Sequence, residues 1–146
     1  MIDIWTVVRF VHVTGAALWV GGQLTVLLIV LPPVRRLLGL TERASVLKAV
    51  GRRFAVITTA GFVPAQIAGG WLLAWHRGVT WQSLTEPGYG RVLVAKLVLF
   101  ALVMVAASLH GIAQSRGRPQ LARAMSTAAL TGSLGVVLLA TVLVER

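Results

Sequence analysis

Four long apolar runs alternate with short polar links along this chain. The runs cover about residues 4–31, 54–75, 91–113 and 124–144, and each is long enough to cross a bilayer, which takes about 20 apolar residues. Short links favour antiparallel neighbours, so the pattern predicts an all-α membrane protein whose four transmembrane helices form an up-down-up-down bundle. We expect residues 1–146 to form this one four-helix domain.

Prolines and small residues add local detail to these helices. Leu31-Pro32-Pro33 predicts the end of the first span, and Pro64 predicts a kink near Ala60 in the second. Thr41 is the expected N-cap of a basic helix that leads into the second span. Small residues at helical spacing predict close helix contacts, and they are Gly61, Ala65 and Gly69 in the second span and Ala128, Ala129, Gly132 and Ser133 in the fourth.

The distribution of charge predicts the topology. Charged residues make up 12% of the chain, about half of what a soluble domain carries. The net charge of +10 does not indicate nucleic-acid binding, because nine of the fourteen basic residues lie in the links 32–53 and 114–123. The positive-inside rule places both links in the cytoplasm and both termini outside. The outer face then carries an aromatic belt, which consists of Trp5, Trp71, Trp75 and Trp81.

Two ionisable residues, His12 and Lys96, lie inside apolar runs. Such groups cost roughly 2.5–3.5 kcal/mol on insertion scales, and by default they indicate function. Spans one and three run in the same direction, so both residues lie roughly 7–9 Å outside the midplane. His110 falls near the cytoplasmic end of span three, on the order of 20 Å from His12 in depth. One chain therefore cannot bind one ion through both histidines.

The predicted site is an outer-leaflet cluster of Arg9, His12 and Lys96, with His76 at the membrane surface above it. One helical stripe would face the bundle, and it consists of Arg9, His12, Ala16, Trp19 and Gln23. The candidate cofactor-binding residues are Arg9, His12, Trp19 and Lys96, and the candidate metal ligands are His12, His76, His110 and Met104. A neutral imidazole is a ligand for copper, zinc or haem iron, whereas a cluster of protonated groups would suit an anion or haem propionates.

Each of these residues also has a purely structural interpretation. Lys96 can snorkel to the outer interface, and His12 can be a hydrogen-bonded residue between helices. His76 and His110 can simply border the membrane surface, and Trp19 can be a packing residue. Met104 stands alone as a soft sulfur ligand between Lys96 and His110 in depth, so it can equally be a flexible filler.

The chain has no cysteine, so disulfides and thiolate metal sites are excluded. It also shows no nucleophile–base pair, carboxylate pair or phosphate-binding loop, so hydrolytic catalysis has no support. We therefore do not expect an enzyme.

Three segments together resemble the copper-resistance protein D (CopD) family of bacterial membrane proteins. They are VHVTGAALWVGG, GRRFAVITTAGFVPAQIAGGWLLAW and EPGYGRVLVAKLVLFALV, and the resemblance covers nearly all of the chain. The related HemJ type of protoporphyrinogen oxidase is similar in the same places, where His12, Lys96 and His110 fall on its His, Lys and His positions. It differs after span one, where LPPVRR has no further histidine.

The CopD resemblance implies copper transport, homeostasis or resistance at the bacterial inner membrane, with His12 as a ligand reached from outside. A second copy of the chain or a periplasmic copper-binding protein would be the partner. The HemJ resemblance implies b-type haem, with His12 as axial ligand and Lys96 as second ligand or propionate partner. If the chain is an enzyme, this resemblance implies a haem-dependent oxidoreductase. A third hypothesis is an accessory membrane subunit without a cofactor.

Overall fold

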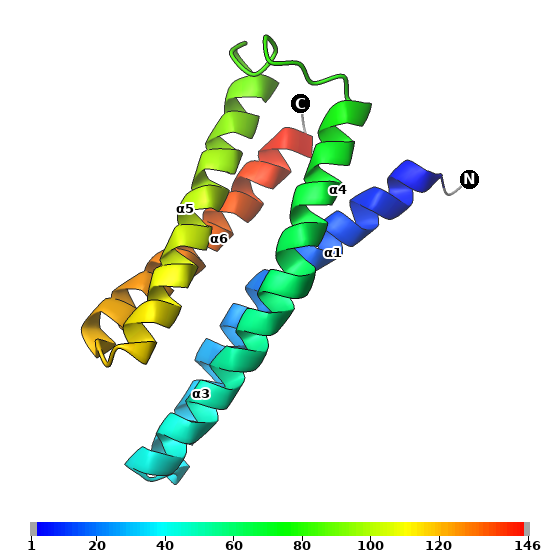
Figure 1. The fold of residues 1–146 in the computed structure, drawn as a ribbon. Coiled ribbons are helices and arrows are strands. Elements are labelled where there is room, and N and C mark those ends of the chain that lie inside the picture. The colour runs from blue at the N-terminus through cyan, green and yellow to red at the C-terminus, as the bar shows by residue number, and fades with distance from the viewer. Residues whose placement is uncertain (1–2, 145–146) are drawn as a thin grey trace. The chain divides into compact units, whose positions relative to one another are not determined.

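The structure, a computed structural model, describes residues 3–144, and these residues form helices and turns without any strand. Four helical segments are long and apolar enough to cross a membrane (Figure 1), which agrees with the predicted all-α membrane fold. They cover Ile4–Leu37, Leu40–His76, Tyr89–Ser115 and Pro119–Leu143. The chain divides into two compact units, Met1–Arg77 and Gly78–Arg146, and each contains two of these segments.

The first unit is a long helical hairpin. Its first arm consists of α1 (Ile4–Thr25), the π-helical turn η1 (Val26–Val30) and α2 (Leu31–Leu37). Its second arm consists of α3 (Leu40–Ile57), the π-helical turn η2 (Thr58–Phe62) and α4 (Val63–His76). The arms run antiparallel, and α1 packs mainly on α4.

The predicted end of the first span at Pro32-Pro33 is wrong, because the helix continues to Leu37. Both prolines lie in the first turn of α2, where a missing N–H costs least, and η1 shifts the hydrogen-bond register just before them. A second π-helical turn, η2, precedes Pro64 in the same way. It includes Ala60, so the helix is irregular where the sequence predicts it. Within η2 the Thr58 hydroxyl donates to the Phe54 carbonyl at 2.7 Å.

The tip of the hairpin also differs from the prediction. Thr41 is not the N-cap, because α3 already begins at Leu40 and Gly39 caps it. The Gly39 N–H donates to Oε2 of Glu42 at 3.3 Å, so the Glu42 side chain satisfies a donor at the helix start. Thr41 lies one residue inside the helix. A two-residue turn, Leu38-Gly39, is therefore enough to join the two arms.

The second unit consists of α5 (Tyr89–Ser115) and α6 (Pro119–Val144), which pack against each other along much of their length. Small side chains let the helices approach, as expected in membranes. Ala129 and Ser133 are buried, and a Cβ on Gly132 would lie 2.5 Å from Cγ2 of Val103, whereas Ala128 is exposed. The small-residue contact predicted for the fourth span is thus confirmed for three of its four members.

Candidate functional site

His12 lies on α1 against two consecutive glycines of α4. A Cβ on Gly69 would lie 3.1 Å from Nδ1 of His12, and one on Gly70 would lie 3.4 Å from Cε1. The ring therefore occupies the space that a side chain at either position would fill. Close helix contacts were predicted for Gly61, Ala65 and Gly69. Gly69 is buried against His12, whereas a Cβ on Gly61 would meet nothing within 4 Å.

A glutamine fixes the backbone beneath the imidazole. Nε2 of Gln66 on α4 donates to the backbone carbonyl of His12 at 2.8 Å. A Cβ on Gly15 would lie 2.7 Å from that same Nε2, so Gly15 makes room for the amide. The sequence prediction missed Gln66, although an amide side chain inside an apolar span was the available signal.

The orientation of the ring decides which nitrogen of His12 can bind a metal. Nδ1 is buried and faces Gly69. A metal bound at Nδ1 would need to sit about 2 Å from it, on the buried side of the ring next to Gly69. Nε2 is therefore the nitrogen suited to bind a ligand at this position.

Trp19, one of the predicted cofactor-binding residues, takes part in an aromatic cluster. It is buried, and its ring stacks on Phe62 with 4.6 Å between centroids and lies 5.1 Å from the ring of Phe54. A Cβ on Gly22 would lie 2.7 Å from Phe54, so this glycine admits the Phe54 ring. The geometry matches the packing interpretation of Trp19, because stacked rings of this kind stabilise helix contacts.

At the other end of the same helix pair, the rings of Trp5 and His76 stack with a centroid distance of 4.0 Å and an interplanar angle of 12°. Asp3 caps α1 close by, where its Oδ1 accepts from the hydroxyl of Thr6 at 2.6 Å and from its N–H at 2.7 Å. Both bonds lower the pKa of Asp3 below its usual value of 3.8, and the bond from the Thr6 hydroxyl has the larger effect. His76 thus ties the end of α4 to the start of α1.

Two further candidates, Arg9 and Lys96, were predicted to lie beside His12. Arg9 is exposed on α1, whereas His12 on the same stripe is half-buried. Lys96 belongs to α5 in the second unit, where it is half-buried. The predicted proximity of Arg9, His12 and Lys96 therefore stays a prediction.

His110 lies near the end of α5, where its Nδ1 is 2.8 Å from the backbone carbonyl of Ala122 on α6. A carbonyl can only accept, so Nδ1 carries the proton and Nε2 is the basic nitrogen of a neutral ring. Met104 is half-buried on α5, and its carbonyl accepts from the hydroxyl of Ser108 at 2.8 Å. The described part of α5 and α6 thus orients His110 through the backbone.

Across residues 3–144, no group of three or more His, Cys, Asp or Glu side chains is placed to hold a metal ion. Comparison with known proteins adds no further guidance, since no family model, curated protein or solved structure matches this chain. The resemblance to the CopD and HemJ families therefore stays a prediction. The His12 seat on Gly69 and Gly70 is the best-defined arrangement around a candidate ligand in the first unit.

Proposed function

We propose that this chain is a multi-pass membrane protein that handles copper, and that His12 is a ligand through which the ion passes. The observation that carries the proposal is the seat of the His12 ring on Gly69 and Gly70, with Gln66 holding the backbone of His12. An imidazole inside a membrane-spanning helix is costly to insert, so its presence there indicates a function by default. The resemblance to the CopD family supplies the expectation of copper.

Imidazole nitrogen suits copper, and the geometry of the seat favours Nε2 as the donor. Nδ1 faces the backbone of α4, so the ring presents one nitrogen in one orientation. A fixed ring loses little conformational freedom when it binds an ion, which favours binding. One imidazole supplies one donor, so a copper ion at His12 needs further ligands. A second copy of the chain or a periplasmic copper-binding protein would supply them.

The proposal includes a location. Four apolar helices are compatible with a lipid bilayer, and the basic links at 32–53 and 114–123 favour a cytoplasmic position for both turns. We propose the bacterial inner membrane, with both termini on the periplasmic side. In this orientation His12 lies in the outer leaflet and receives copper from the periplasm.

Metal binding by the purified full-length chain tests the proposal. Copper(I) is titrated in detergent against a competing chelator, and His12→Ala is compared with His76→Ala and His110→Ala, which remove an imidazole elsewhere. We expect His12→Ala alone to weaken copper binding by about tenfold or more, since loss of one ligand of this kind costs at least about 1.4 kcal/mol. Equal affinity in all three variants would overturn the role of His12.

An absorption spectrum of the same preparation separates the other hypotheses. A Soret band that His12→Ala abolishes would replace the copper proposal with a b-type haem protein. A colourless protein that retains no copper, from cells whose copper tolerance does not change on deletion of the gene, would instead indicate a cofactor-free accessory subunit.

A further inference from the structure

The helical hairpin of the first unit is longer than a bilayer is thick. Its arms contain 34 residues, Ile4–Leu37, and 37 residues, Leu40–His76. At 1.5 Å per residue both exceed about 50 Å, whereas the hydrocarbon core measures about 30 Å. One end of the hairpin must therefore extend past the hydrocarbon.

Side-chain contacts show which end extends. Phe54 lies level with Gly22 and Trp19, and His76 lies level with Trp5. Between these two levels lie about 33 Å of helix in the second arm and about 26 Å in the first, values on either side of the thickness of the hydrocarbon core. Arg52 and Arg53 immediately precede Phe54 and mark the end of that layer. The part left over is residues 23–53, here named the distal hairpin.

The distal hairpin combines one apolar arm with one basic arm. Antiparallel pairing from the Gly22–Phe54 contact places the apolar run Leu24–Leu31 beside the basic part of α3, beyond the level of the arginine pair. Leu28 is 65% exposed, and Leu37 and Leu40 at the tip are 80% and 77% exposed. Exposed apolar side chains gathered in this way mark a contact surface.

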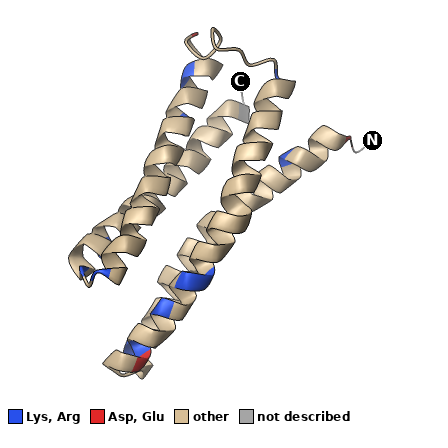
Figure 2. Ribbon diagram, viewed as in Figure 1, with Lys and Arg blue, Asp and Glu red and all other residues tan. Residues whose placement is uncertain are grey.

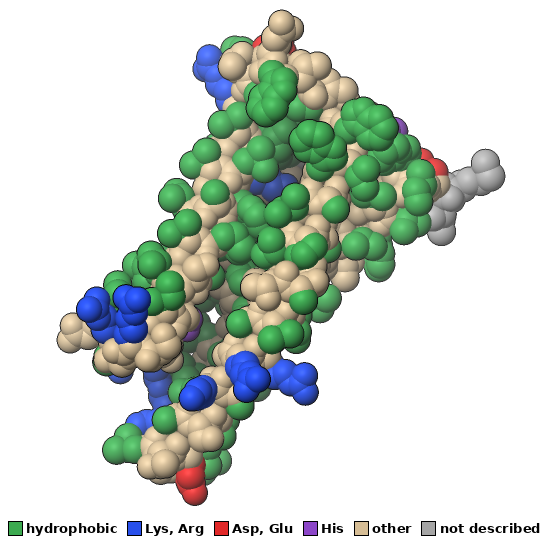
Figure 3. Space-filling view, viewed as in Figure 1, with side chains coloured by type: hydrophobic (Ala, Val, Ile, Leu, Met, Phe, Trp, Pro, Cys, Tyr) green, Lys and Arg blue, Asp and Glu red, His purple; other side chains and the backbone are tan. Residues whose placement is uncertain are grey.

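The charges of the distal hairpin are almost all positive (Figure 2). The basic residues are Arg35, Arg36, Arg43, Lys48, Arg52 and Arg53. The one acidic residue, Glu42, is engaged with the N–H of Gly39 at the tip. Basic side chains stand out from the lower end of α3 in the space-filling view (Figure 3). The complementary partner is therefore anionic.

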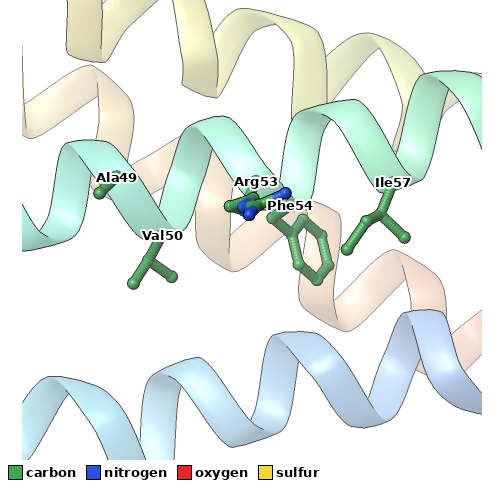
Figure 4. Close-up of a pocket in the computed structure, with 5 residues that line it drawn as sticks. All are labelled: Ala49, Val50, Arg53, Phe54 and Ile57. Carbon is green, nitrogen blue, oxygen red and sulfur yellow. The ribbon is translucent and has the colours of Figure 1, made fainter.

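A shallow, open depression on the surface of α3 has an apolar lining. Its lining consists of Ala49, Val50, Arg53, Phe54 and Ile57 (Figure 4). Four of these side chains are apolar, and the fifth is a guanidinium at the level where the hydrocarbon layer ends. An acyl chain can lie along this apolar surface.

We propose that the distal hairpin binds the surface of a bilayer that contains anionic phospholipid. Its exposed leucines enter the boundary of the acyl chains, and its basic residues contact headgroup phosphates, as in amphipathic interfacial helices. The π turn η1 and the prolines after it lie within the hairpin, at a position where helices bend most readily. The second arm has no such break, because α3 is continuous from Leu40 to Ile57, so the hairpin can approach the membrane only by tilting as a whole. Each basic residue strengthens adsorption by about fivefold.

The absence of cysteine from the sequence allows a direct test with the full-length chain. A nitroxide spin label at Leu28→Cys is reconstituted in phosphatidylcholine alone or mixed with phosphatidylglycerol. Collisions with oxygen report lipid, and collisions with an uncharged nickel chelate report water. We expect the anionic bilayer to raise oxygen collisions and to lower nickel collisions severalfold. A label at Leu18→Cys, which is 71% exposed within the spanning part, should report lipid in every sample.

Charge variants complete the test. Lys48→Gln/Arg52→Gln/Arg53→Gln should weaken adsorption about a hundredfold, so that the Leu28 label in the anionic bilayer resembles the label in phosphatidylcholine. The matched control Arg116→Gln/Arg118→Gln/Arg123→Gln removes three charges from the other basic link and should change nothing at Leu28. If the Leu28 label, in a protein that keeps all its basic residues, collides equally often with the nickel chelate in both bilayers, the proposal is overturned. Protection of the label from both reagents would also overturn it, because a protein surface would then cover the hairpin.

Discussion

The ring of His12 lies against the backbone of Gly69, where a Cβ would stand 3.1 Å from Nδ1 and 3.3 Å from the Cβ of His12. A side chain at position 69 would be tighter than ordinary contact and would push the ring by a few tenths of an ångström, so a glycine on α4 lets the imidazole of α1 lie this close. The same contact turns Nδ1 toward the protein and so selects Nε2 for any ligand. Position 69 therefore controls His12 without carrying any ligand atom itself.

Substitution of Gly69 should disturb the seat of His12. We expect Gly69→Val to lower the free energy of unfolding by about 1–3 kcal/mol, the usual cost of overpacking, and to weaken copper binding in parallel with His12→Ala. Thermal melting in detergent and the chelator titration measure the two effects. Gly61→Val is the matched control, because a Cβ there would meet nothing within 4 Å. Equal destabilisation by both substitutions would show that helix propensity, and not the His12 contact, is responsible.

Gln66 and Gly15 should behave as one coupled pair. Gln66→Ala removes the hydrogen bond to the His12 carbonyl, which is worth about 0.6 kcal/mol on average between membrane helices. Gly15→Ala places a Cβ 2.7 Å from Nε2 of Gln66 and should also destabilise the protein. In a double-mutant cycle the cost of Gly15→Ala should fall markedly when residue 66 is alanine. Strict additivity of the two costs would mean that the clash is relieved in some other way.

The sequence predicts the spans well because lipid imposes length and apolarity on them, and four helices of this kind are present. It does not predict their ends. Pro32 and Pro33 normally stop a helix, yet the register shift in η1 lets the chain continue to Leu37. A π turn depends on packing with the opposite arm, and periodicity in one sequence does not contain that information.

The candidate site is predictable only in part for a related reason. An imidazole in an apolar run is visible in the sequence, so His12 could be chosen at once. Its contacts with Gly69 and Gln66 depend on the antiparallel register of α1 and α4, which no local pattern fixes. Arg9 shows the limit of an argument from spacing. It follows the helical spacing of His12 but is exposed, so spacing alone does not tell which side chains of a stripe are buried.

The N-cap of α1 should make the stability of the first unit depend on acidic pH. Hydrogen bonds from Thr6 lower the pKa of Asp3 in the folded protein, so the carboxylate contributes stability above the unfolded pKa of about 3.8. That contribution is lost as pH falls through the lower, folded pKa. Hydrogen exchange at the first turn of α1 should therefore accelerate below about pH 4 in the unsubstituted protein, after correction for intrinsic rates. Asp3→Asn, which retains a capping oxygen, should lose this pH dependence. The same acid-induced acceleration in Asp3→Asn would assign it to another group.

Gly90 should be the least replaceable glycine of the second unit. It is buried in the first turn of α5, where an added Cβ would collide with the backbone carbonyl of Ser83. A backbone atom cannot turn aside as a flexible side chain can, so the loop of residues 78–88 would have to move. We expect Gly90→Ala to cost more than about 2 kcal/mol and to expose this loop to protease.

Gly111→Ala is the control for this substitution, because a Cβ at Gly111 on the same helix would meet nothing within 4 Å. There the gain in helix propensity should stabilise α5 by up to about 1 kcal/mol. Thermal melting and limited proteolysis of the two variants should therefore shift in opposite directions. If Gly90→Ala melts at or above the temperature of the unsubstituted protein, the close approach of the Ser83 carbonyl to α5 is not maintained in the membrane protein.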